Sequence, residues 1–252
     1  MIEALLALHG ELAGLAVQGA VAFLRVGGVM LLLPGLGDAM IPARIRLVVA
    51  LALAAAIHPV VPIPPAGPTP GLILAETATG LAFGAVLRFL ASALTVAGMM
   101  AAQMLSLAQL LGAPSAEPST VLGNVLNLAG LAILMASGLP LMVVETLIRS
   151  YDVVPVGAVL PAGPAAEWGI ARLSHAFALA LALAAPFALA ALLYNAALGV
   201  VNRAMPQLMV ALVGAPLATG AAGVILWLAA PTVLTVWKTA MIALLAAPGG
   251  LP

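Results

Sequence analysis

Three charged residues stand inside stretches of this sequence that are otherwise apolar, and they have the most potential for chemistry. Arg25, Glu76 and Arg88 each lie in a segment long enough to cross a membrane. An unpaired charge there costs at least about 2.5 to 3.5 kcal/mol, so each should face a partner or water. One interpretation is a polar pathway for ions or a small substrate. The other places the charges near helix ends, where they snorkel or meet other subunits.

The spacing of these charges limits how they can pair. Glu76 and Arg88 are about three turns apart on one expected helix, a separation of roughly 18 Å. We therefore do not expect them to form a direct ion pair.

Other kinds of chemistry find little support in the residue types. His9, His58 and His175 are scattered, and no second histidine follows any of them at helical spacing, which argues against a metal site. The absence of cysteine excludes disulfides and thiolate chemistry. No serine lies in a G-x-S-x-G nucleophile elbow. We expect no enzyme activity, cofactor or metal, and an intramembrane enzyme is the weakest alternative.

A short polar stretch interrupts the apolar sequence near the C-terminal end. It reads NRAMPQ and contributes Asn202, Arg203, Pro206 and Gln207 between two hydrophobic segments. The interruption is compact and carries one fixed positive charge. This pattern predicts the tip of a helical hairpin. The simpler alternative is a turn that only exposes Arg203 to solvent.

The composition that surrounds these residues is that of a polytopic membrane protein. The 252 residues are 65% hydrophobic and only 6% charged, whereas soluble domains carry roughly 25% charged residues. Eight basic and eight acidic residues give zero formal net charge, so no basic field is available to gather nucleic acid. The first segment carries Glu3 and Glu11 and lacks the basic start of a signal peptide, so we expect it to stay attached.

Six apolar segments are expected to form helices. They are rich in Ala and Leu and lack the alternating blocks of a membrane barrel, so the predicted class is all-α. The last segment is either one very long helix or a span broken near Pro231. Basic residues do not fix the orientation, because three fall on each side if the helices alternate. The segments are 12–33, 45–63, 72–107, 121–148, 173–201 and 208–245, with proline-rich connections at 58–71, 110–120 and 150–169.

The sequence contains, in this order, the stretches FLRVGG, AAQML, SYDVVPVG and NRAMPQ. Together they resemble the FliR family of flagellar export-gate proteins, which has counterparts in injectisome type III secretion. FLRVGGVMLLLPGLGDAMIPARIR resembles the opening pattern of the family, with Phe-x-Arg, Pro and then Pro-x-Arg. AAQML and SYDVVPVG follow in the same order as in the family. The most specific piece is LGVVNRAMPQLMVALVGAPL, which resembles the Asn-Arg-x-x-Pro-Gln tip of the family. The similarity covers nearly the whole chain.

The resemblance implies a subunit that assembles with FliP and FliQ homologues into a closed export gate. Such a gate sits in the bacterial inner membrane, within the flagellar basal body, and conducts unfolded flagellar proteins. The fold implied is one of long tilted helical hairpins, with a FliP-like part at about 1–169 and a FliQ-like hairpin at about 170–252. An FlhB homologue is expected at the cytoplasmic side.

The resemblance also implies two functional segments. One is a pore plug in the loop after the third long helix, where glycine and prolines stop a helix and two leucines can fill a narrow lumen. An ordinary surface loop is the alternative. The other is the hairpin tip, where Arg203 would meet neighbouring subunits. The plug residues are Leu110, Leu111, Gly112, Ala113, Pro114, Ser115 and Pro118.

Two positions depart from the family pattern. Ala113 stands where the family usually has Asp, and Leu139 stands where it has His. Both changes remove polar groups, so any gating role of those groups is not carried over.

A secondary transporter of small solutes is the main rival function. It would use Arg25, Glu76 and Arg88 as its polar pathway. Such transporters are commonly built from two related halves with matching broken helices. No internal repeat is evident in this sequence, which favours the export-gate interpretation.

Overall fold

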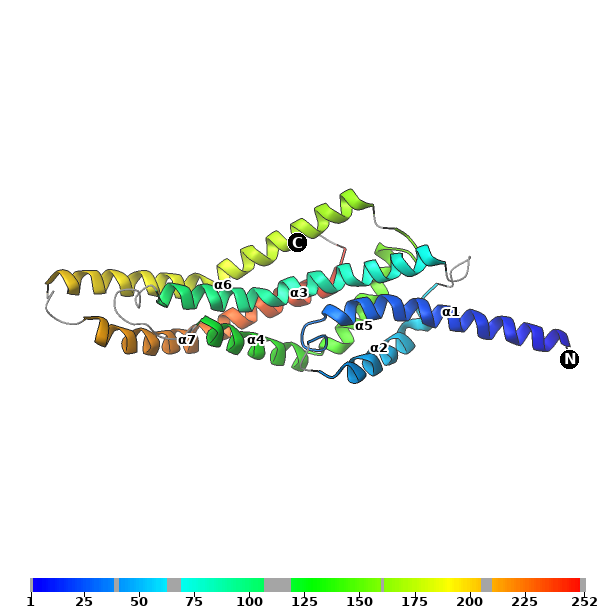
Figure 1. Cartoon of the computed structure of the whole chain (residues 1–252), viewed down its shortest axis with the longest axis horizontal. Helices are drawn as coiled ribbons and strands as arrows, with labels where there is room; N and C mark the ends of the chain where they lie inside the picture. The colour runs from blue at the N-terminus through cyan, green and yellow to red at the C-terminus, as the bar shows by residue number, and fades with distance from the viewer. Residues whose placement is uncertain are drawn as a thin grey trace. The chain divides into compact units, whose positions relative to one another are not determined.

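The computed structural model describes residues 2–38, 41–62, 69–106, 119–159, 161–204 and 210–249. All regular secondary structure in these ranges is helical, so the expected all-α class is confirmed (Figure 1). The elements are α1 (Ile2–Leu32), α2 (Ala43–Ile57), the short 3₁₀ helix η1 (His58–Val60), α3 (Pro70–Ser106), α4 (Ser119–Ala136), α5 (Leu139–Val153), α6 (Ala162–Ala204) and α7 (Val210–Ala246).

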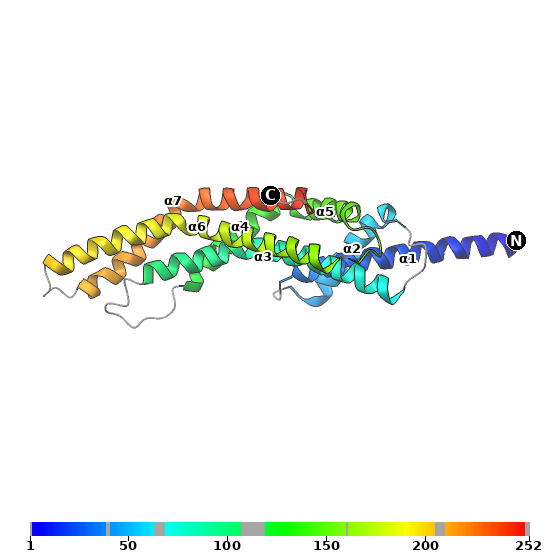
Figure 2. The ribbon, with the colours of Figure 1, turned by 90° about the horizontal axis from the view of Figure 1, so that it is seen from above.

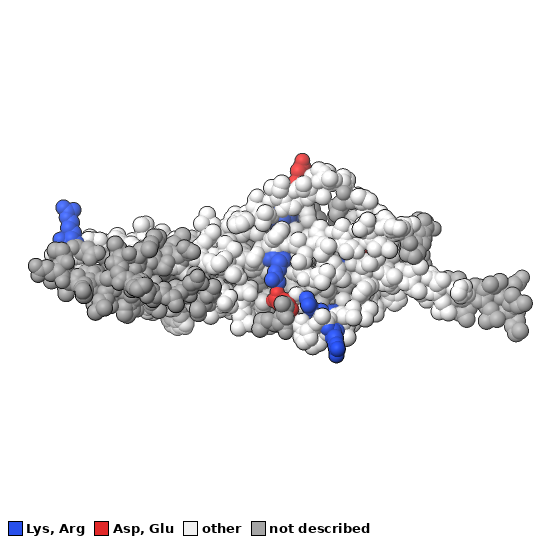
Figure 3. Space-filling model, viewed as in Figure 1, with Lys and Arg blue, Asp and Glu red and all other residues white. Residues whose placement is uncertain are grey.

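Within the ranges that the structure describes, five stretches of helix are long and apolar enough to cross a membrane. They are Leu12–Leu32, Ala43–Val60, Pro70–Ala102, Ala162–Val201 and Gly223–Ala246. A sixth crossing would combine Gly123–Ala136 with Leu139–Val153, which meet at a bend of 75°. Charged atoms are sparse on the face that Figure 3 presents. The polytopic membrane class follows from these lengths and compositions.

The prediction of one helix over 121–148 is wrong. The chain breaks at Ser137 and Gly138, so α4 and α5 are separate helices. Gly138 has a φ of 88°, a left-handed conformation that side-chain-bearing residues rarely adopt. Pro140 then lies in the first turn of α5, where its missing N–H costs nothing.

One other predicted connection is corrected, and one open alternative is decided. The connection expected over 150–169 is largely helical, because α5 continues to Val153 and α6 begins at Ala162. The last helix does not break at Pro231, since α7 runs through it to Ala246. In α6, Pro186 is likewise accommodated. Proline removes one backbone donor, and helices in apolar surroundings tolerate this when neighbouring groups compensate.

The described helices divide into two compact units. The first contains Met1–Phe89, Met135–Leu173 and Met241–Pro252, and the second contains Leu90–Leu134 and Ser174–Ala240. In the first unit α2 packs against α1, η1 and α5, and the neighbouring positions of α1 and α2 are visible in both Figure 1 and Figure 2.

The second unit is organised around a buried tryptophan. Trp237 is fully buried, and its indole N–H donates a hydrogen bond of 2.9 Å to the Leu90 carbonyl. Gly130 leaves room for its ring, because a Cβ there would lie 3.1 Å from the indole. An indole whose N–H finds a partner can be buried without an unsatisfied donor.

The last residues of α7 belong to the first unit, and two side chains of α5 in the same unit bind their carbonyls. Thr146 donates to the Leu245 carbonyl over 2.7 Å, and Arg149 donates to the Ala246 carbonyl over 2.6 Å. The last carbonyls of a helix have no partner within the helix, and they carry the negative end of its dipole. A hydroxyl and a guanidinium therefore satisfy carbonyls that would otherwise be exposed to an apolar environment.

Candidate functional site: a buried arginine and glutamate network

Two glycines allow α1 and α3 to approach closely, and this contact positions the site. A Cβ on Gly80 would lie 2.2 Å from the Arg25 carbonyl oxygen, and a Cβ on Gly28 would lie 2.8 Å from the Leu81 nitrogen. Only residues without a side chain fit at such a crossing. Gly80 thus packs directly against the backbone of α1.

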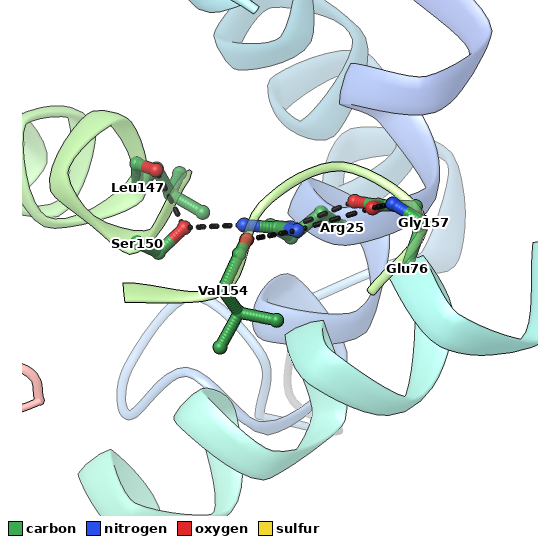
Figure 4. A network of polar contacts seen from close by, with 6 residues as sticks. All are labelled: Arg25, Glu76, Leu147, Ser150, Val154 and Gly157. Atoms are coloured by element: carbon green, nitrogen blue, oxygen red, sulfur yellow. Dashed lines mark hydrogen bonds and ion pairs between the residues drawn. The ribbon is translucent and has the colours of Figure 1, made fainter. Parts of the chain in front are cut away.

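Arg25 of α1 and Glu76 of α3 form a two-point ion pair at this crossing (Figure 4). The Arg25 Nε donates to Glu76 Oε2 over 2.7 Å, and Nη2 donates to Oε1 over 3.1 Å. The planar guanidinium matches the two carboxylate oxygens, and this geometry gives the strongest kind of charge-assisted hydrogen bond. The expectation that each of these charges has a partner is confirmed.

The end of α5 and the turn after it complete the network. Arg25 Nη1 donates to Ser150 Oγ over 3.2 Å, and Nη2 donates to the Val154 carbonyl over 2.9 Å. The Gly157 N–H donates to Glu76 Oε1 over 2.8 Å. Gly157 has a φ of 72°, which favours glycine. The turn thereby directs one carbonyl at the cation and one amide at the carboxylate.

The network is closed to solvent. Both Arg25 and Glu76 are 0% exposed, and the Tyr151 ring covers the guanidinium with its centroid 3.8 Å from Cζ. Desolvated charges are tolerated when they are paired and their remaining donors and acceptors are bonded. The arrangement therefore favours a fixed contact between α1, α3 and the end of α5 over a conducting pathway.

Arg88 belongs to a different and more exposed pair. It donates to a carboxylate oxygen of Asp38, and the exposed fractions of the two side chains are 48% and 28%. Since Arg25 and Glu76 pair with each other, the three charges do not form one continuous polar path in the first unit. Within the described ranges no three His, Cys, Asp or Glu residues gather to hold a metal.

Comparisons with known proteins decide the family. The profile described as bacterial export proteins, family 1, matches residues 16–244. A flagellar biosynthetic protein FliR of Caulobacter vibrioides is 35% identical over 206 residues, which cover 79% of this chain and 82% of the relative. A FliR of Aquifex aeolicus is 29% identical over 220 residues, which cover 84% of each chain. The chain belongs to the FliR family of export proteins. The resemblance found from the sequence motifs is thus confirmed.

Two of the motifs that carry the FliR resemblance meet in the buried network. Arg25 lies in FLRVGG, and Ser150, Val154 and Gly157 all lie in SYDVVPVG. The four-residue spacing from Ser150 to Val154 spans the last turn of α5, and Gly157 follows in the turn. The two motifs therefore share one structural task, which is to surround the charged pair.

The hairpin tip is only partly described. Asn202 lies in the last turn of α6, and the position of its side chain is outside the description. Arg203 lies beside it and is exposed. Pro206 and Gln207 lie outside the described residues, as does the whole expected plug, from Leu110 to Pro118.

Sequence reasoning missed the groups that complete the network. It assigned Arg25 and Glu76 to a pathway or to helix ends, and it named no role for Ser150, Gly157 or Asp38. A signal was available, because Ser150 and Gly157 flank a proline in a motif that carried the family resemblance. Their proximity to Arg25 depends on a contact between residues 125 positions apart.

Proposed function

We propose that this chain is a subunit of the flagellar type III export gate and forms part of the wall of a closed pore. Unfolded flagellar proteins pass through this pore during assembly of the flagellum, and the subunit performs no chemistry of its own. The observation that carries the proposal is the family match over 16–244, which includes almost every described helix.

The proposal includes a place and partners. The chain sits in the bacterial inner membrane, within the flagellar basal body, and assembles with FliP and FliQ homologues. An FlhB homologue contacts its cytoplasmic side. Support comes from the relatives named flagellar biosynthetic protein and from five helices able to cross a membrane.

The same proposal divides the chain by role. Residues 1–169 act as a FliP-like part, and 170–252 act as a FliQ-like hairpin built from α6 and α7. The loop 110–118 plugs the pore when no substrate moves, and the tip around Arg203 meets neighbouring subunits. The exposed position of Arg203 at the end of α6 is compatible with such a contact.

The buried network supports a passive structural role. A gate subunit must keep its helices in register while a chain passes along them. Arg25 joins α1, α3 and the end of α5 through four hydrogen bonds that water does not reach. A buried, fully bonded ion pair fixes relative positions even where it adds little net stability.

Co-purification tests the assembly. The chain is expressed with and without FliP and FliQ homologues of its own source, and the mass of the detergent-purified product is measured. We expect a heteromeric complex that forms only when the partners are present. A monomer or homodimer indifferent to them contradicts the gate and favours the transporter of small solutes.

Complementation tests the export function. A strain that lacks its own FliR receives this chain, and flagellin in the culture medium and swimming motility are measured. We expect both to be restored at a normal level of membrane-inserted protein. Normal insertion and normal complex formation with no secreted flagellin would contradict the assignment to flagellar export.

A further inference from the structure

An apolar groove with a positively charged mouth lies between α1 and α2. Its volume is about 490 Å³, and it is separate from the buried network. Arg46 and Thr77 are the polar residues of its wall, which is otherwise hydrophobic or glycine. The lining consists of Phe23, Leu24, Gly27, Gly28, Met30, Leu31, Ala43, Arg46, Leu47, Ala50 and Thr77.

Arg46 lines this groove, and no ion pair among the described residues offsets its positive charge. Its Nε is buried and has no hydrogen-bond partner, and its Nη1 makes one long bond of 3.3 Å to the Gly37 carbonyl. The ion pairs among the described residues are Arg25 with Glu76, Arg88 with Asp38 and Arg149 with Glu145. No described carboxylate therefore pairs with Arg46 or with the exposed Arg44.

The start of α2 adds to the positive potential at the mouth. The helix follows Pro42, which provides no side-chain cap, and its first turn contains no acidic residue. The N-terminal end of a helix carries partial positive charge, and arginine there is unfavourable without an anion. Arg46, in the first turn of α2, therefore favours an anion beside the apolar groove.

We propose that this groove binds an anionic phospholipid. The phosphate lies at Arg46 near the start of α2, and one acyl chain lies along the groove past Gly27 and Leu47. Basic pockets between membrane helices recognise anionic lipid headgroups in this way.

The charge and the surroundings of the site favour a lipid over a partner helix. No described carboxylate pairs with Arg46, and a phosphate group would supply the missing negative charge. Leu31 and Leu47 at the groove are 60% and 51% exposed, so this face of the chain presents apolar surface outward. Both properties are those of a lipid-facing crevice.

Lipid titration with native mass spectrometry tests the proposal. The purified full chain, with its partner subunits where they co-purify, is titrated with phosphatidylglycerol or with phosphatidylcholine of the same acyl chains. We expect phosphatidylglycerol to bind more tightly. Arg46→Gln should weaken phosphatidylglycerol binding about fivefold and leave phosphatidylcholine unchanged.

A matched pair of glycine variants tests the groove itself. A Cβ at Gly27 or at Gly19 meets nothing within 4 Å, so both sites of α1 accept a larger side chain. Gly27 lines the groove and Gly19 does not. We expect Gly27→Leu to abolish lipid binding and Gly19→Leu to retain it.

Other outcomes would overturn the proposal. Equal binding of both lipids to all variants excludes recognition at Arg46. Glycerol 3-phosphate competing as well as the lipid would mean a phosphate site in which the groove has no role. A photo-crosslinker at Leu47 that captures another protein chain in place of lipid would assign the groove to a partner helix. None of these results would disturb the export-gate proposal, which co-purification and secretion test separately.

Discussion

At the scale of single residues, Arg25 concentrates more interactions than any other charged side chain that the structure describes. Its guanidinium makes four hydrogen bonds and lies over one aromatic ring, and the whole side chain is inaccessible to solvent. Removing one partner of such a pair leaves an uncompensated buried charge, whereas replacing both removes the charges together. The consequence of a substitution here depends on which partner remains.

The first prediction compares the removal of one charge of the buried pair with the removal of both charges. Glu76→Gln alone should lower the free energy of unfolding by about 3 to 5 kcal/mol, because Arg25 keeps its charge and loses its carboxylate. The double variant Arg25→Met with Glu76→Leu should be less destabilised than Glu76→Gln. Detergent-based unfolding of the purified variants measures both.

Asp38→Asn serves as the matched control for that measurement. It breaks the Arg88 pair, whose side chains are far more exposed, so the effect should be only about 0 to 1 kcal/mol. An equal loss of stability for Asp38→Asn and Glu76→Gln would contradict the special status of the buried pair.

At the scale of helices, the α1 and α3 crossing determines where the charged residues meet. A Cβ added to Gly80 would lie only 2.2 Å from the backbone carbonyl oxygen of Arg25. Gly80 therefore controls the distance between the two helices, and through it the geometry of the ion pair.

The second prediction follows from this crossing. Gly80→Ala should destabilise the protein by about 1 to 3 kcal/mol, since the backbone must shift to admit the new methyl group. Gly71→Ala in the same helix is the control, because a Cβ there meets nothing within 4 Å, and it should be neutral or slightly stabilising. Thermal unfolding in detergent distinguishes them, and coincident melting curves would argue against a tight crossing.

Hydrophobic segment lengths predicted the all-α class and most helices, but local breaks were harder to place. The apolar run over 121–148 contains Gly138 and Pro140, a combination that can end a helix, but hydrophobic length alone does not reveal the break. Pro231 left both one long helix and a broken span open, and α7 runs through it as one helix. The pairing of Arg25 with Glu76 was out of reach, since it depends on a contact between residues 51 positions apart.

At the scale of the whole molecule, the pore plug and the partner contact are both proposed for segments that adjoin the ends of long helices. The expected plug follows α3, and the expected tip joins α6 to α7. Both segments adjoin a helix that is longer than one bilayer crossing of about 20 residues, namely α3 before the plug and α6 and α7 on either side of the tip, whereas α4 after the plug has 18 residues. Their effects should therefore appear in the assembled gate and leave the stability of the isolated chain nearly unchanged.

The third prediction concerns the plug. Deletion of 110–118 from the chain in its assembled complex should raise the leak of small ions across the membrane, because leucine side chains no longer exclude water from the lumen. Conductance of the reconstituted complex in planar bilayers measures this. Unchanged conductance, with the complex intact by mass, would remove the plug from consideration.

The fourth prediction concerns the tip. Arg203→Ala should reduce swimming motility at a normal protein level, since a fixed charge at the end of α6 would no longer meet acidic groups or carbonyls of a neighbouring subunit. Soft-agar motility together with an immunoblot provides the measurement. Full motility would favour a residue that only faces solvent.

The buried pair also has a consequence for biosynthesis. The ribosome makes Arg25 fifty-one residues before Glu76, and Ser150 and Val154 emerge later still. During that interval the first apolar helix carries a lone cation, which costs about 2.5 to 3.5 kcal/mol in lipid. Insertion of this helix should therefore become more favourable once α3 has been synthesised and supplies the counter-charge.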